Sequence, residues 1–522
     1  MAAMNGSYPV YQYKEGDCTM TIDEIESMKQ ALIHMRESKD VELKKAKKGL
    51  PESFWESYSS FANTTGGVIV FGVNEGATDN EIVGVEDSQK IVADLWNLLS
   101  NDSKVSYRTV NNQDVTTAVI DDKTVILIQV NEAPNNVKPV YINGKIDNTW
   151  IRTGDGDRKA KKEEIASMLR NAKPGMDSLP IDGCTLDDLD MESVIRFKQQ
   201  VANRYPAKKY LEMSDADFLI EIGACRLHRE NHKYQILRGT LLFLGKLNVI
   251  KEFYPHFHLD FFNRRGSNPR WEDRVSDDEP NDYEMNIFNF FNIVDEKLRV
   301  LQNSSFHLDD RQKRIPEGNF NETIRECLVN CLAHADYEQG YPSIKIQAYD
   351  GWFSFFNPGE MLISRRQFPL GGDSRPRNEI IMKLFRLLGA AERQGFGGPL
   401  IFKTALQYDY RSPELDTNLE STELRVWNID LADSYPELSK EEKSVLRYLH
   451  KSMSAISINE LSKKTDMTYY RVKKIIHSLK ERNFIEQIGS GPSTKYVVKA
   501  GSEESLTQIQ IAMDVMKRRL TR

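Results

Sequence analysis

The sequence has few cysteines and no long apolar run. Its 522 residues include five cysteines, an odd number, and none of them form a C-x-x-C pair. A disulfide framework or a zinc ribbon is therefore not expected, and a reducing, cytoplasmic setting is predicted. No apolar run approaches the ~18–20 residues that span a bilayer, so no membrane association is expected. Residues 1–16 also lack the apolar core of a signal segment.

A surplus of basic residues is absent as well. There are 70 Lys and Arg residues against 77 Asp and Glu residues, a formal net charge of −7. This balance excludes a protein coated with positive charge, so any nucleic-acid site must be a local patch. The hydrophobic share of 40% and the charged share of 28% are typical of a soluble protein with a core. At roughly 100–200 residues per domain, the length predicts about three domains.

Two breaker-rich stretches, 173–180 and 432–436, divide the chain. They predict three parts, 1–175, 176–435 and 436–522. The hydrophobic patterns predict a mixed α+β multidomain protein. In the first part they predict helices near 21–35 and 51–62, and strands at 68–73, 116–120, 124–130 and 149–152. In the middle part, the apolar run 241–244 is expected to be a buried strand rather than part of a P-loop.

Acidic residues and a lysine gather in the stretch 37–44. On a strand, Glu42 and Lys44 point to the same face because side chains alternate. Glu37 would face the other way in an unbroken strand, so we expect a turn at 38–40. The buried strand at 68–73 places Glu75 just beyond its exposed end. Such acids and a lysine can hold a divalent metal and stabilise developing charge. A solvated surface face is the alternative interpretation.

The E-S-x-x-V-E-x-K stretch from Glu37, the F-A-N-T-x-G-G motif at 61–67 and the strand ending in G-V-x-[DE] resemble the Schlafen-type AlbA domain. The segment 148–154 is similar to that family's closing Y-I-R-x-G, so the resemblance spans about 30–170. It implies a metal-dependent endoribonuclease acting on structured RNA such as tRNA. Three acids would bind Mg²⁺ or Mn²⁺, with Lys44 in support: Glu37, Glu42 and Glu75. Animal Schlafens usually have Asp at the third position. Bacterial relatives also include nucleic-acid-binding regulators. Four lysines supply phosphate-directed charge in either case: Lys39, Lys45, Lys47 and Lys48.

The segment 325–336 has the most distinctive spacing in the chain. Glu326, Asn330 and His334 recur every four residues and therefore share one helical face. A carboxylate and an amide one turn apart suit a water-activating base beside a neutral Mg²⁺ ligand. Clustered glycines near 395–398 let backbone N–H groups approach phosphates. An ordinary core helix with a polar face is the alternative interpretation.

The order of these motifs resembles the GHKL ATPases, and more closely the divergent RecG-like ATP-binding domain. The resemblance implies a GHKL-like α/β sandwich that binds ATP with Mg²⁺. Glu326 would be the general base and Asn330 the metal ligand, with His334 on the same face of the helix. The remaining positions fall in the adenine-reading box and the phosphate lid: Asn357 and Gly359, then Gly395 and Gly397.

The last part combines a basic segment with helical patterns. Residues 463–482 hold seven basic and two acidic residues, a local charge of +5. The segment 438–498 resembles bacterial winged helix-turn-helix domains, in which the third helix contacts DNA. The expected contact residues begin that helix: Thr468, Tyr469, Tyr470, Arg471 and Lys474. A protein-docking role is the alternative. An amphipathic helix near 503–520 predicts self-association as a homo-oligomer.

Together these patterns predict a cytoplasmic bacterial protein that acts on nucleic acid, RNA or DNA, and responds to ATP. The leading hypothesis is a Schlafen-like metal-dependent nuclease gated by the GHKL-like domain, with an anti-phage or stress role. The second hypothesis is an ATP-sensing transcriptional regulator that binds DNA without cutting it.

Overall fold

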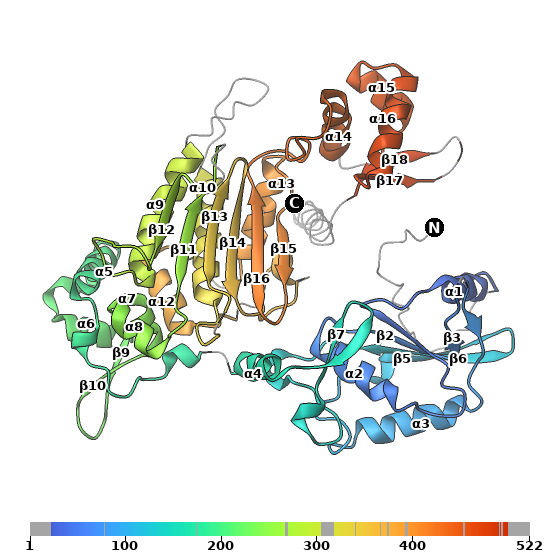
Figure 1. Ribbon diagram of the computed structural model, residues 1–522, viewed down its shortest axis with the longest axis horizontal. Coiled ribbons are helices and arrows are strands. Elements are labelled where there is room, and N and C mark those ends of the chain that lie inside the picture. The colour runs from blue at the N-terminus through green and yellow to red at the C-terminus, as the bar shows by residue number, and fades with distance from the viewer. Residues whose placement is uncertain are drawn as a thin grey trace, which may run out of the picture. The chain divides into compact units, whose positions relative to one another are not determined.

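The computed structural model describes residues 22–77, 79–173, 175–266, 270–303, 318–339, 341–365, 367–372, 375–391, 395–452, 455–489, 491 and 494–499. The chain divides into two compact units, Met1–Lys173 and Pro174–Arg522 (Figure 1). Both units mix helices and strands, which confirms the predicted α+β class. Within the described ranges, no helix is long and apolar enough to cross a membrane. The predicted closing helix at 503–520 and the first residue of the helix predicted near 21–35 lie outside the described residues.

Unit 1 is built on a four-stranded sheet in the order β1-β2-β6-β5. β1 is parallel to β2, and the other neighbours are antiparallel. The strands are β1 (Val41–Lys44), β2 (Gly67–Phe71), β5 (Val115–Ile120) and β6 (Lys123–Val130), with the small pairs β3 (Val73–Asn74) and β4 (Glu81–Ile82), and β7 (Trp150–Thr153) and β8 (Gly156–Lys159). The helices are α1 (Ile22–His34), α2 (Ser53–Asn63), α3 (Ser88–Leu99) and α4 (Lys162–Asn171).

The sheet of unit 1 buries both faces. Ile69 and Phe71 of β2 belong to a core that includes buried residues of α2 and α3, whereas Val70 belongs to a second core with Leu32 of α1. Alternate residues of a strand point to opposite faces, so one strand supplies both cores. The predicted strand 68–73 is interrupted at Gly72, whose φ is +90°. A Cβ there would lie 3.1 Å from the backbone of Gly84, so the close approach requires glycine.

Unit 2 contains a six-stranded mixed sheet in the order β12-β11-β13-β14-β16-β15, in which only β11 and β13 are parallel. The strands of this part are β9 (Cys225–Leu227), β10 (Tyr234–Ile236), β11 (Leu259–Asn263), β12 (Asp273–Ser276), β13 (Ile344–Tyr349), β14 (Trp352–Pro358), β15 (Glu414–Thr417) and β16 (Ser421–Trp427). The helices are α5 (Met191–Arg204), α6 (Asp215–Glu221), α7 (Arg238–Leu244), α8 (Leu247–Phe253), α9 (Ile287–Asn303), α10 (Gly318–His334), α11 (Gln367–Leu370), α12 (Glu379–Leu388) and α13 (Gly397–Gln407).

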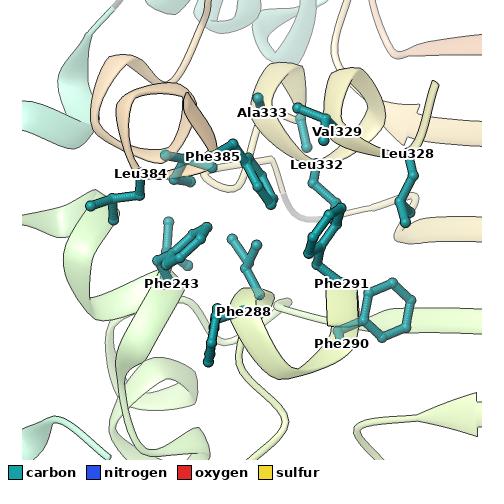
Figure 2. Packing of buried hydrophobic residues seen from close by; sticks show 14 of the residues in the cluster. Phe243, Phe288, Phe290, Phe291, Leu328, Val329, Leu332, Ala333, Leu384 and Phe385 are labelled. Carbon is teal, nitrogen blue, oxygen red and sulfur yellow. The ribbon is translucent and has the colours of Figure 1, made fainter. Parts of the chain in front are cut away.

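The apolar face of α10 packs into a core rich in phenylalanine. Leu328 and Leu332 are fully buried and point toward phenylalanines of α9 (Figure 2). Phe385 of α12 stacks edge-on against Phe243 of α7 and Phe291 of α9, with ring centroids 5.0 Å apart in each pair. This packing fixes α10 against its neighbours and leaves its polar face for the sheet side. The run 241–244, predicted as a buried strand, is in fact the end of helix α7.

The last part of unit 2 has its own hydrophobic core. Its elements are α14 (Lys440–Ser452), α15 (Ile458–Thr465), α16 (Tyr469–Glu481), β17 (Ile485–Ile488) and β18 (Lys495–Val498). β17 and β18 pair antiparallel, and Ile456 forms a further bridge to Tyr496 of β18. Three helices thus precede a small sheet, the element order that the sequence predicted. The winged-helix assignment and the boundary at 435/436 stay predictions.

Candidate functional site

The acidic stretch of unit 1 is held by an arginine from β7. Both carboxylate oxygens of Glu42 are ion-paired: Oε1 lies 2.9 Å from Nζ of Lys44, and Oε2 lies 2.8 Å from a guanidinium nitrogen of Arg152. Glu42 and Lys44 therefore share one face of β1. Arg152 also donates to Asp157 at 2.8 Å and to the carbonyl oxygens of Ser38 and Val41. Its side chain is 3% exposed, so this is a buried, hydrogen-bonded charge network.

Glu37 and Glu75 lie beside this network. Ser38 and Val41 exchange backbone hydrogen bonds, which forms the predicted turn and redirects Glu37. The Glu37 carboxylate then accepts the backbone N–H of Leu43 at 3.1 Å, and the Glu37 backbone N–H donates to the Glu75 carboxylate at 3.4 Å. Burial raises the pKa of Glu37, and the charges of Glu42 and Glu75 raise it further. Glu37 is thus close enough to Glu42 and Glu75 to be repelled by both.

The carboxylates of Glu37, Glu42 and Glu75 are candidate ligands of a metal ion. Oxygen donors of this type suit Mg²⁺ and Mn²⁺. Among the residues that the structure describes, however, no three His, Cys, Asp or Glu side chains are grouped to hold a metal. Glu42 would have to leave Lys44 or Arg152 before it could bind a cation. The donors fit in type, and the metal role of Glu37, Glu42 and Glu75 stays a prediction.

The F-A-N-T-T-G-G motif is structural. Asn63 is fully buried, and its side-chain amide donates to the carbonyl oxygens of Val140 and Trp150 and accepts the N–H of Val140 at 2.7 Å. Asn63 therefore joins α2 to the segment that leads into β7, the strand that carries Arg152. Gly66 has a φ of +75°, and a Cβ there would lie 2.8 Å from the Val130 oxygen. The motif positions the acidic network rather than contributing ligands to it.

The exposed lysines near β1 include Lys39, Lys47 and Lys48. In the described part of the chain, none of the three has a recorded ion pair or side-chain hydrogen bond. They can therefore meet phosphate groups without first breaking an internal contact.

Unit 2 contains a pocket between α10 and the sheet. The space between the lining residues is about 1090 Å³, a figure that includes open solvent. Six of the seven nucleotide-binding residues that the sequence predicted line it: Glu326, Asn330, His334, Asn357, Gly395 and Gly397. The seventh, Gly359, is not among the lining residues. It has a φ of +92° and packs against Asp336 and Arg377, where a Cβ would lie 2.9 Å from the Asp336 side chain.

The polar face of α10 runs along this pocket. Nδ2 of Asn330 donates to Oε1 of Glu326 at 3.1 Å, so the amide oxygen is left to accept or to ligate. A Cβ on Gly397 would clash with the Glu326 carboxylate, so the first turn of α13 lies directly against this end of α10. The N–H groups of a helix's first turn carry partial positive charge and favour anions.

The other end of the face is at His334. Burial lowers the pKa of His334 to about 4, and the charge of Arg377 acts in the same direction. The imidazole is therefore neutral at pH 7. Arg377 is anchored by hydrogen bonds to the carbonyl oxygens of His334 and Glu360. Asn357 is 6% exposed and lies at the end of β14, and its Nδ2 donates to the Pro358 oxygen. Sequence reasoning assigned no role to Arg377, because its hydrogen-bond partners lie on distant segments.

Glycines line part of the pocket. Gly371 and Gly395 have φ values of +75° and +84°. The Gly372 N–H donates to the Gly395 oxygen at 3.3 Å, and a Cβ on Gly395 would clash with the Gly372 oxygen. Only glycine allows these two backbones to approach so closely. The segment 392–394 between α12 and Gly395 lies outside the described residues.

The predicted DNA-contact residues begin α16. Thr468 is the N-cap residue, but its side chain makes no capping hydrogen bond. Thr468, Tyr469, Tyr470 and Lys474 are exposed, Tyr470 at 83%. Arg471 is exposed but ion-paired with Glu441 of α14. The first two turns of α16 therefore present two aromatic rings and Lys474 to solvent.

Three segments of the chain match models of known families. Residues 37–161 match the model described as "Schlafen, AlbA_2", and residues 342–426 match "Putative ATP-dependent DNA helicase recG C-terminal". Residues 166–260 match a domain of unknown function. The chain therefore carries a Schlafen AlbA_2 domain and a RecG-type ATPase-like domain, which confirms both resemblances. The 342–426 match includes Asn357, Gly359, Gly395 and Gly397 but not α10.

Solved structures give weaker likenesses. The DIP2311 protein from Corynebacterium diphtheriae is 14% identical, covers 91% of this chain and 99% of its own, and has a TM-score of 0.38. The N-terminal domain of a putative ATP-dependent DNA helicase RecG-related protein from Nitrosomonas europaea is 23% identical. It covers 27% of this chain and 92% of its own, with a TM-score of 0.19. At these scores neither likeness assigns a function. No curated protein matches the chain.

Proposed function

We propose that the protein binds nucleic acid and that its state is set by ATP bound in the pocket between α10 and the six-stranded sheet. The observation that carries this proposal is the lining of the pocket. Residues from α10, the end of β14 and the glycine segment at 395–397 are far apart in sequence and meet in one cavity. They are residues to which the resemblance to the GHKL ATPases assigns roles in ATP binding. The match to the RecG-type model supports the same interpretation.

In this proposal the residues of the pocket have different roles in binding and hydrolysing ATP. Asn357 and the apolar side chains near it would hold the base, and the glycines at 395–398 would meet the phosphates through their backbone N–H groups. Glu326 would take the proton of an attacking water, and Asn330 would orient Glu326 through its hydrogen bond. A Mg²⁺ ion, held through the Asn330 oxygen, would supply charge compensation for the phosphates.

Nucleic-acid binding is proposed from exposed charge and aromatic surface. Lys39, Lys47 and Lys48 surround β1 in the AlbA_2 domain, and Tyr469, Tyr470 and Lys474 begin α16. Aromatic rings and lysines of this kind contact bases and phosphates. The proposal also includes a cytoplasmic location and a homo-oligomeric state.

The first test is nucleotide binding by calorimetry on the full chain. Wild type should bind ATP, and Glu326→Gln should retain binding while losing turnover. Glu322→Gln is the matched control, because Glu322 is exposed one turn earlier on the same helix. Equal turnover in all three proteins would remove Glu326 as the base. Absence of ATP binding by wild type would refute the proposed function.

Metal-dependent RNA cleavage is the second candidate. The specific observation is that burial raises the pKa of Glu37 and that the negative charges of Glu42 and Glu75 raise it further, a repulsion that a bound cation would relieve. The test uses labelled tRNA, single-stranded RNA and duplex DNA with Mg²⁺ or Mn²⁺, with and without ATP. Cleavage lost in Glu42→Ala supports the nuclease. Tight binding of duplex DNA without cleavage supports a regulator.

A further inference from the structure

Two arginines line the nucleotide pocket without a protein partner. Arg386 lies on α12, and Arg375 lies in the segment that leads into α12. Across the residues that the structure describes, neither side chain has a recorded hydrogen bond or ion pair. The Nε atom of Arg386 is buried and unpaired. A buried donor on a charged group that lacks a partner is costly, so its retention points to a partner from outside the chain.

Arginines near the same region are paired. Arg377 donates to two carbonyl oxygens, and Arg325 forms an ion pair with Asp295. Arg425, which faces solvent more, is held by Glu423. The lack of partners at Arg375 and Arg386 is thus a property of the pocket and not of this part of the fold.

The position of α12 places Arg386 along the pocket. α12 starts beside the end of α10, because Asn378 donates to the carbonyl oxygens of Ala333 and Ala335. Arg386 follows eight residues later, about 12 Å along the helix. The pocket-lining residue Met382 lies one turn before it. Asp177 accepts the first three backbone N–H groups of α12, which fixes the helix in place.

The chemistry of these groups selects an anion. A guanidinium group presents a fork of donors that matches phosphate oxygens. The first turn of α13, with Gly397 and Gly398, lines the same pocket and adds backbone N–H groups. The carboxylate at that end, Glu326, is already hydrogen-bonded by Asn330.

We propose that Arg386 and Arg375 are the side chains that bind the phosphates of the nucleotide and so make the pocket select a di- or triphosphate over a nucleoside. This inference rests on the proposed nucleotide function. It adds the residues that recognise the charged end of the ligand, which neither motif spacing nor the matched family segments assign.

The experiment compares adenosine, ADP, ATP and inorganic tripolyphosphate as ligands of the full chain by calorimetry. The variants are Arg386→Gln, Arg375→Gln and Arg386→Lys, and Lys383→Gln is the matched control because Lys383 is exposed on the same helix. We expect each Gln variant to bind ATP and ADP at least about tenfold more weakly and adenosine unchanged. Arg386→Lys should recover part of the loss, and Lys383→Gln should match wild type.

The outcomes separate the two proposals. Wild-type affinity for ATP in both Gln variants overturns the phosphate-binding role while the nucleotide function stands. Equal losses for adenosine and ATP also overturn it, because that pattern indicates a disturbed fold. If wild type binds tripolyphosphate but no nucleotide, and Arg386→Gln loses it, the anion site stands and the nucleotide function fails. Thermal unfolding of each variant checks that α12 is still in place.

Discussion

Removal of Arg152 should loosen the acidic site of unit 1 strongly. Arg152→Gln takes away one guanidinium that serves Glu42, Asp157 and two carbonyl oxygens, and whose side chain is 3% exposed. At about 1.5–3 kcal/mol for each hydrogen bond to a charged group, a simple sum over the four bonds would overestimate the destabilisation, because bonds to one group are not additive. The loss of one partner from a buried ion pair costs about 3–5 kcal/mol. Arg152→Gln should therefore lower the free energy of unfolding of unit 1 by about 3–5 kcal/mol.

Hydrogen exchange on the full chain is the suitable assay, because two compact units need not unfold together. Peptides that cover β1 and β7 should exchange roughly a hundredfold faster or more in Arg152→Gln, since every 1.4 kcal/mol is a factor of ten. Peptides of unit 2 should be unchanged. Arg108→Gln is the control, because Arg108 is exposed in the same unit. Wild-type protection of β1 in Arg152→Gln would refute the network as a source of stability.

Three other results are expected. Hydrogen bonds to Asp260 and a second aspartate raise the pKa of His258 to about 10. The stability from this raised pKa is present below pH 6.5 and lost as the pH rises through 10. The free energy of unfolding should therefore fall more steeply over this window in wild type than in His258→Gln, and the exposed His256→Gln should follow wild type. In denaturant titrations Asp177→Ala should cost about 1–2 kcal/mol, and a cost near zero would refute its capping of α12. Lys474→Gln should weaken duplex DNA binding and lower the salt slope by about one, and an unchanged slope would exclude phosphate contact.

Local spacing predicted the parts of the sites that depend on one element. Glu326, Asn330 and His334 share a face because a helix repeats every 3.6 residues, and all three line one pocket. Glu42 and Lys44 share a face because a strand alternates, and they are ion-paired. These relations hold over a few residues, so the sequence contains them directly.

Contacts between distant segments were not predictable in the same way. Arg152 lies 110 residues from Glu42, and only the fold brings the two together. Arg386 stands out through the lack of a partner, which no sequence pattern records. The run 241–244 was wrongly predicted as a strand, because four consecutive apolar residues show neither a helical nor a strand period. The helix that they form packs against α9 and α12, and these contacts between distant segments are not visible in the local sequence.

The two candidate sites differ in how their charges are compensated. In unit 1 the carboxylate of Glu42 is already neutralised by Lys44 and Arg152, so a metal ion must displace an existing ion pair. In unit 2 the pocket holds Arg375 and Arg386 without partners, so an anion gains contacts and breaks none. Binding free energy is reduced by the contacts that must first be lost. Nucleotide binding should therefore need no rearrangement of side chains, whereas any metal binding at Glu42 should be weak until Lys44 or Arg152 is drawn away. The phosphate groups of a nucleic acid can form ion pairs with the side chains of Lys44 and Arg152. Metal binding at Glu42 should accordingly be tighter with RNA present than without it.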